Sequence, residues 1–465
     1  MTHNLDGGLK GRPQIHSQEK TLNAITLSVV RNLTTKLAGS SVALLLGGVL
    51  FAGATLPLHA ATTCVNPGGT QGCFGSISAA VAVAAPNDTI NVWAGTYSEY
   101  VVVPKPLHII GANAANTIVD AAGLPNGFNI DGLNNGGLAN VSIRNFTVQN
   151  ANFEGIVATN TSFLNISNNK VLNNDRSLNN GQCPGLPSWE TAEGFDCGEG
   201  IHLDAVDHSV VVSNESAYNA GGILLSDETG VTHDNLVSKN NVHDNPYDCG
   251  ITLASHVPAP NMNQGNPFGL AHNTIYDNTS VHNGNDGEGA GVGIFDSAPG
   301  TTNNGNVVVG NMLADNGQPG VAMHGHTPNQ QLNDTLIVDN VLVANSADGG
   351  DAATPGPTGI NVFGVSPSTG TVIALNNFEK EQVDIVAHIP GEVFAPLNNL
   401  TAYGLNLGLL NIGPGFVNGT SDWWGCGKGP NQHGCSGTMT FQSGTLLVNP
   451  WLRSKYNPNS GSSKK

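Results

Sequence analysis

Six acidic and imidazole side chains recur at short intervals over the central third of the chain. They are Asp204, Asp227, Glu228, His256, Asp296 and His324. Paired carboxyl groups hydrolyse glycosidic bonds, with one protonating the leaving oxygen and the other activating water or attacking the sugar. These residue types therefore favour chemistry on a carbohydrate, with one of the four carboxyl groups as acid and another as base.

Aromatic and further histidine side chains accompany this set. His202, Phe295 and His326 lie within two residues of a member of the set, and Trp189 lies in a long insertion upstream. Aromatic rings offer a large, rigid contact surface, and histidine adds polar nitrogens. These four residues are the candidate substrate-binding residues.

A five-residue phrase positions most of these side chains. It occurs as GIVAT at Gly155, GIHLD at Gly200, GILLS at Gly222, GITLA at Gly250, GVGIF at Gly291, GVAMH at Gly320 and GINVF at Gly359. The second and fourth places are apolar, so alternation puts them on one face of a strand and the third place and fifth place on the other. We expect the acidic and imidazole groups to form a row on the outward face.

A second phrase follows each copy: an aliphatic residue and, three places later, asparagine. The asparagines are Asn169, Asn214, Asn240, Asn278, Asn311, Asn340 and Asn376. Asparagine at a sharp turn can hydrogen-bond its copy in the next coil. Two strands and a turn in units of unequal length predict an all-β, right-handed parallel β-helix.

The two ends of this solenoid are expected to be covered. A short helix within Ser76–Ala85 would cover the first coil, and a disulfide-closed loop from Cys426 to Cys435 would cover the last. The predicted organisation is a leader over residues 1–61, one β-helix domain over 62–452 and a disordered tail over 453–465.

The leader has the layout of a secretory signal. An apolar stretch over residues 41–58 follows Arg31 and Lys36 and precedes Ala60 and Ala61. A transmembrane anchor is the alternative, but glycines and a proline interrupt a run already at the lower length limit. We expect a secreted, surface or periplasmic protein with no stable membrane insertion after cleavage.

Cysteine spacing supports export. The local pairs are Cys64–Cys73, Cys183–Cys197 and Cys426–Cys435, which leaves Cys249 as a free, buried thiol.

The charge balance limits the partners. The formal net charge is −18, and removal of residues 1–60, with five basic and two acidic residues, makes it about −21. Nucleic acid is therefore disfavoured as a partner. A lyase or epimerase acting on uronic acids needs Arg, Lys or a cation such as calcium to neutralise the substrate carboxylate. Between residues 200 and 330 the only Lys or Arg is Lys239, against nine histidines, so hydrolysis is favoured and a metal requirement stays open.

An insertion over residues 175–197 precedes the row. Trp189 could stack on a sugar, and Glu190, Glu193 and Asp196 could add carboxylates or ligate calcium. Alternatively, the insertion only shields the sheet.

From about Cys64 to Leu452 the chain resembles secreted parallel β-helix repeat proteins, the superfamily of pectate lyases, polygalacturonases, alginate lyases and epimerases. The resemblance is carried by AVAAPNDTINVWAGTYSE (residues 82–99), the two phrases and the terminal WWG. It implies polysaccharide binding along the outward face of one sheet.

The resemblance does not fix the reaction. The polygalacturonase pattern Asn-Thr-Asp, Asp-Asp, Gly-His-Gly and the epimerase motif Asp-Pro-His are not met. We favour a monomeric polysaccharide-degrading enzyme, a glycoside hydrolase before a lyase or C5-epimerase. The alternative is a noncatalytic module that binds glycan or acts as a spacer, with the outward row merely solvated.

Overall fold

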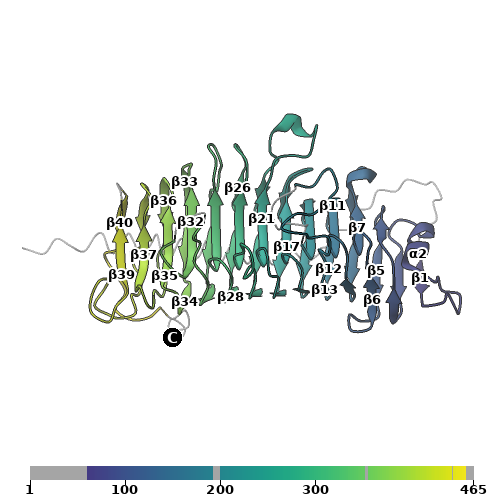
Figure 1. Cartoon of the computed structure of the whole chain (residues 1–465), viewed down its shortest axis with the longest axis horizontal. Coiled ribbons are helices and arrows are strands. Elements are labelled where there is room, and N and C mark those ends of the chain that lie inside the picture. Colours follow the sequence, from purple (N-terminus) through teal and green to yellow (C-terminus); the bar gives the residue numbers. More distant parts are fainter. Residues whose placement is uncertain (1–59, 192–198, 351–353, 442–443, 457–465) are drawn as a thin grey trace, which may run out of the picture. The chain divides into compact units, whose positions relative to one another are not determined.

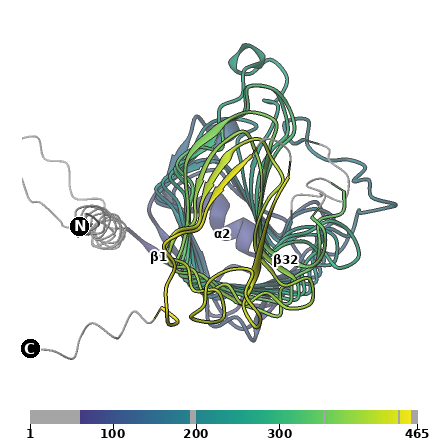
Figure 2. The same cartoon turned by 90° about the vertical axis from the view of Figure 1, so that its left-hand side faces the viewer.

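The computed structural model describes residues 60–191, 199–350, 354–441 and 444–456. Over the described residues the strands form successive coils, and each named strand pairs in parallel with a named strand of an adjacent coil (Figure 1). The coils overlie one another around a common interior when viewed end-on (Figure 2). The predicted parallel β-helix is confirmed. The predicted leader lies outside the described residues except for Ala60 and Ala61, and the predicted tail is described only to Tyr456.

Sheet A has fourteen strands and runs through the whole described solenoid. Its strands are β1 (Thr62–Val65), β2 (Thr89–Val92), β5 (His108–Gly111), β9 (Ser142–Arg144), β12 (Asn165–Ser167), β15 (Val210–Val212), β19 (Leu236–Ser238), β23 (Thr274–Tyr276), β27 (Val307–Val309), β30 (Leu336–Val338), β33 (Ser368–Ala374), β36 (Gly391–Phe394), β38 (Phe416–Asn418) and β40 (Thr445–Leu447).

Sheet B has ten strands, which follow the sheet A strands from β2 to β33. They are β3 (Gly95–Tyr97), β6 (Thr117–Asp120), β10 (Thr147–Gln149), β13 (Lys170–Leu172), β16 (Glu215–Ala217), β20 (Asn241–His243), β24 (Thr279–Val281), β28 (Met312–Ala314), β31 (Val341–Val343) and β34 (Asn377–Glu379).

Sheet C has sixteen strands and contains all copies of the glycine phrase. They are β4 (Val101–Val103), β7 (Phe128–Asp131), β8 (Leu138–Ala139), β11 (Ile156–Ser162), β14 (Ile201–Asp207), β17 (Ile223–Ser226), β18 (Thr232–His233), β21 (Ile251–Ser255), β22 (Leu270–Ala271), β25 (Val292–Asp296), β26 (Asn303–Asn304), β29 (Val321–Gly325), β32 (Thr358–Gly364), β35 (Val383–His388), β37 (Leu407–Asn411) and β39 (Gly437–Thr440).

Helix α2 (Ile77–Val83) covers the first coil, as predicted (Figure 2). The Ser76 hydroxyl accepts a hydrogen bond from the Ala79 N–H and so caps its N-terminus, while Ile77, Ala80 and Val81 are buried. Two single turns of 3₁₀ helix, Leu133–Asn135 and Asn263–Gly265, lie in loops. Within the described ranges, no helix is long and apolar enough to cross a membrane.

The predicted disulfides Cys64–Cys73 and Cys426–Cys435 are present, and Cys249 is a free thiol. The third predicted pair falls on Cys197, which lies outside the described residues.

The interior is an aliphatic column. The second places of the phrases pair in register from coil to coil and are fully buried: Ile156, Ile201, Ile223, Ile251, Val292, Val321 and Ile360. Because each residue packs against its copies above and below, burial of this apolar surface stabilises neighbouring coils together. The predicted inward ladder is confirmed.

The predicted asparagine ladder is also confirmed. The Asn214 side chain shows the pattern: its backbone N–H and its Nδ2 both donate to Oδ1 of Asn240, at 2.9 and 3.0 Å, and Nδ2 also donates to the Ile166 carbonyl in the preceding coil. The residue before each ladder asparagine is in the left-handed region, as Ser213 (φ 58°) and Lys239 (φ 56°) illustrate. That conformation costs about 1–3 kcal/mol per residue, and three hydrogen bonds of about 1 kcal/mol each offset it.

Two of the three asparagine ladders end on a carboxyl group, whereas the third, through Asn235 and Asn273, ends at Asn306. The first ends at Asp422, which accepts from Asn398. A second ladder, five residues further along each coil, runs through Asn174, Asn219, Asn245, Asn283, Asn316 and Asn345 to Glu381. Burial raises the pKa of Glu381 to about 7, although its hydrogen bonds with Asn345 act in the opposite direction.

Replacing Glu381 with Gln should make the protein more stable at pH 8. The folded carboxyl group holds its proton up to about pH 7, whereas the ordinary value is 4.5, so its contribution to stability is present at low pH and is lost as pH rises through this window. Glutamine keeps an acceptor for Asn345 and cannot ionise. The free energy of unfolding of the variant, relative to wild type, should be about 2–3 kcal/mol higher at pH 8 than at pH 4. Chemical denaturation of both proteins at the two pH values measures it.

The matched control is Glu392→Gln on β36, where the side chain is exposed. The control should have the same pH dependence of stability as wild type. If Glu381→Gln also has the wild-type pH dependence, the raised pKa of Glu381 is contradicted.

Candidate active site

The register of sheet C turns the fifth places of the phrase into one outward column. Asp204 on β14 pairs with Ser226 on β17. Further along the sheet, the paired residues are Ala254, Phe295, His324, Phe363 and His388. Residues that are distant in sequence thus lie side by side at one lateral position, as expected for Asp204, Phe295 and His324.

Asp204 and Glu228 are the two carboxyl groups that the outward face brings together. Oδ1 of Asp204 accepts from the Thr229 N–H at 3.1 Å, and its other oxygen accepts from the Thr229 hydroxyl, so the residue beside Glu228 is bonded directly to Asp204. Both side chains are buried. Burial raises the pKa of Asp204 well above its ordinary value, and the neighbouring Glu228 charge raises it further.

Glu228 has the opposite character. Burial alone would raise its pKa, but the charge of His256 and a hydrogen bond from this ring lower it below its ordinary range, and His202 adds to the effect. The His256 Nδ1 lies 2.9 Å from Oε1 of Glu228. Two adjacent carboxyl groups with pKa values displaced in opposite directions are typical of an acid and base pair.

His202 lies two residues before Asp204 on β14 and contacts the insertion. Its ring lies 5.7 Å from the ring of Trp189, centre to centre. The donor atoms of His202, Glu154 and Glu190 lie within 4.8 Å of one another, so these residues could hold a metal ion. The insertion therefore lies against sheet C at this point.

Asp227 and Asp296 do not lie in the outward row, and that expectation is wrong. Asp296 is on β25 with the same parity as Val292 and Ile294 of the core, so it faces inward. Asp227 follows β17, and its carboxylate accepts from the Ser255 hydroxyl at 2.9 Å, the His256 N–H at 2.7 Å and the Gly269 N–H. The Asp227 carboxylate thus holds the chain where it leaves sheet C, and burial raises the pKa of both Asp227 and Asp296.

A cluster of rings continues the outward face beyond the carboxyl pair. The ring centres of Phe295 and His326 are 5.6 Å apart, those of His326 and Phe363 are 5.3 Å apart, and those of Phe363 and His388 are 5.2 Å apart. The His324 ring joins His326 at 5.6 Å, and its Nε2 lies 3.0 Å from Oδ2 of Asp348. We call Phe295, His324, His326, Phe363 and His388 the ring cluster.

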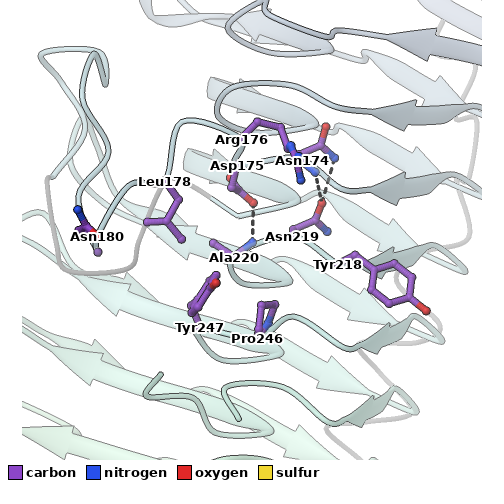
Figure 3. Close-up of a pocket in the computed structure, with 11 residues that line it drawn as sticks. Asn174, Asp175, Arg176, Leu178, Asn180, Tyr218, Asn219, Ala220, Pro246 and Tyr247 are labelled. Atoms are coloured by element: carbon purple, nitrogen blue, oxygen red, sulfur yellow. Dashed lines mark hydrogen bonds between the residues drawn. The ribbon is translucent and has the colours of Figure 1, made fainter. Parts of the chain in front are cut away.

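A separate cavity of about 540 Å³ lies at the base of the insertion (Figure 3). Its lining includes Asp175 and Arg176 from the insertion and Tyr218 and Tyr247 from turns in the next coils. Oδ2 of Asp175 accepts from the Ala220 N–H at 2.8 Å across it. The cavity is at the turns that enter sheet C, and none of the residues predicted for the site lines it.

Comparison with known proteins gives weak similarities only. No family model and no curated protein matches the sequence. The catalytic unit of a thermostable GH87 α-1,3-glucanase from Streptomyces thermodiastaticus is 13% identical with a TM-score of 0.48, covering 88% of this chain and 72% of that one. The Dettilon tailspike protein is 14% identical with a TM-score of 0.48, and the match covers 78% of this chain and 62% of the tailspike chain. An alginate lyase from Paenibacillus is 12% identical with a TM-score of 0.34, and the match covers 81% of this chain and 96% of the lyase chain. The fold and the site therefore rest on the register and contacts of this chain.

Asp227→Asn should destabilise the fold. An amide NH₂ would replace one acceptor oxygen, leaving a buried backbone N–H of His256 or Gly269 without its partner. We expect the free energy of unfolding to fall by about 1–3 kcal/mol, measured by chemical denaturation.

In the control Asp234→Asn, a partly exposed carboxylate is replaced, and the change should stay within about 0.5 kcal/mol. Wild-type stability in Asp227→Asn, with only activity lost, would instead restore Asp227 to the catalytic set.

Proposed function

We propose that the chain is an exported glycoside hydrolase that acts on a polysaccharide lying along the outward face of sheet C. The observation that carries the proposal is the meeting of Asp204 and Glu228 beside His256. Asp204 serves as the general acid, and Glu228, whose carboxylate is held by His256, serves as the base or nucleophile. The ring cluster provides the contact surface for sugar rings on one side of the pair.

Hydrolysis is favoured over elimination by the charges near the pair. A lyase must neutralise a uronate carboxylate and stabilise an enolate-like charge. The only Lys or Arg between residues 200 and 330 is Lys239, and it lies in the turn between β19 and β20, away from sheet C. The proposed substrate is therefore a neutral or weakly acidic glycan.

Noncatalytic glycan binding is the second candidate, and one observation favours it. Asp204 and Glu228 are no more than 1% exposed, whereas Phe295 and Phe363 of the ring cluster are partly exposed. The Ala259 N–H donates to the Glu228 carbonyl, so the segment after β21 lies against the pair. Catalysis requires this covering segment to move, and binding to the ring cluster does not.

Turnover on a glycan panel tests the proposal. Purified mature protein should release reducing ends without unsaturated products. Asp204→Asn and Glu228→Gln should each lower kcat by about 10² or more, because an acid or base contributes this much. The matched control is Asp207→Asn, at the end of the same strand, where the carboxylate bonds to the neighbouring His208. This variant should retain activity.

Binding assays separate the two candidates. If no glycan is cleaved but one binds, and Phe363→Ala weakens that binding, the chain is a binding module. Unchanged kcat in both carboxyl variants would contradict the assignment of the pair. Unsaturated products would contradict hydrolysis.

A further inference from the structure

The cluster of Glu154, Glu190 and His202 brings three potential metal-ligand atoms together. The His202 Nδ1 lies 3.3 Å from Oε1 of Glu154 and 3.6 Å from Oε1 of Glu190. A charge-assisted N–H···O bond is shorter, about 2.7–2.9 Å, and one nitrogen can donate a single proton. Two ligands bound tetrahedrally at about 2.0–2.1 Å from a zinc ion are separated by about 3.3–3.4 Å. The observed spacing is close to that of ligands around a small ion.

The charge of the cluster suits a cation. The side chains are 0–3% exposed, and two carboxylates exceed the charge of one imidazole even when the ring is protonated. The sequence has no Lys or Arg from residue 177 to residue 238, a range that holds Glu190 and the strands β14 to β19; Arg176, at the start of the insertion, lines the separate cavity. A buried excess of negative charge is costly, and a divalent cation removes that excess.

The surroundings of the cluster fix the orientation of two of its members. The Nε2 of His202 lies 2.7 Å from the Ser226 hydroxyl oxygen, and Oε2 of Glu154 accepts a hydrogen bond from the Asn126 amide. Such outer contacts hold a histidine and a carboxylate with one donor atom each directed to a shared point. Glu154 and His202 come from neighbouring coils, whereas Glu190 comes from the insertion.

We propose that Glu154, Glu190 and His202 bind a divalent transition-metal ion of the zinc class, which fastens the insertion to sheet C. An imidazole with two carboxylates suits such an ion. Calcium prefers six to eight oxygen ligands, which is a poorer match to three donors that include a nitrogen. The proposal does not depend on catalysis, because the ion's role is to hold the insertion in place.

Metal titration of the mature protein tests this site. The chain is stripped with EDTA, confirmed metal-free by elemental analysis, and titrated with Zn²⁺ by calorimetry and with Co²⁺ by visible absorption. We expect one ion per chain and a melting temperature that rises with Zn²⁺ but not with an equal concentration of Ca²⁺. Ser226→Ala should weaken Zn²⁺ binding by about 10- to 100-fold, and Glu190→Gln, which removes a ligand, by more.

Glu190 belongs to the insertion and not to a coil, so its replacement leaves the solenoid intact. The matched control is Glu392→Gln, which should bind as wild type. A folded, stripped chain that binds neither Zn²⁺ nor Co²⁺ would overturn the proposal, and so would Glu190→Gln with wild-type affinity. Neither result depends on glycan turnover, so failure of this site and failure of the proposed hydrolase are distinguished.

Discussion

The solenoid depends on the buried asparagine amide that bridges each coil to the next. At the bends between sheets A and B from Asn169 to Asn376 the chain turns sharply, and a buried backbone N–H without an acceptor there would be costly. One amide oxygen accepts from both the backbone and the side chain of the preceding coil, and one NH₂ group reaches back to a carbonyl. Because these bonds form only when the bends are aligned, they fix the register of the strands on either side.

A fixed register explains how unequal coils can form one functional surface. Successive ladder asparagines are separated by 22 to 45 residues, yet their bends superimpose. The variation in length is confined to loops at the ends of the strands, as in the insertion and the segment after β21. Coils of different length therefore still present Asp204, Phe295 and His324 at one lateral position, while the loops cover different parts of the face.

The sequence predicted what local alternation controls. The inward ladder and the asparagine bends depend on a period of two and on a short spacing, so both could be read directly. The same signal, five residues later, would have revealed the second ladder from Asn174 to Asn345. Asp296 is the sixth place of its phrase, and the same alternation puts the sixth place on the inward face. The wrong placement of Asp296 came from extending the outward row beyond the fifth place.

Other parts of the site could not be read from the chain. Glu154 lies just before the first phrase, and only the stacking of coils and the path of the insertion place it beside His202 and Glu190. The Thr229 N–H donates to Asp204 from a loop, and no periodic pattern in the sequence predicts that contact. Burial of the carboxyl pair likewise depends on loops whose course is set by tertiary packing.

Carboxyl groups end two of the three asparagine ladders, and the amides before them give the stack a direction. In each ladder the side-chain amide donates toward the C-terminal coil, so the amide dipoles align along the solenoid. The third ladder ends at Asn306, whose Nδ2 donates to Oδ1 of Asn303 three residues earlier in the same coil. Asp422 and Glu381 have acceptor oxygens for the preceding asparagine and no amide N–H to pass on. They therefore end a ladder without ending the solenoid, because β36 and β38 continue sheet A beyond Glu381 and β40 continues it beyond Asp422.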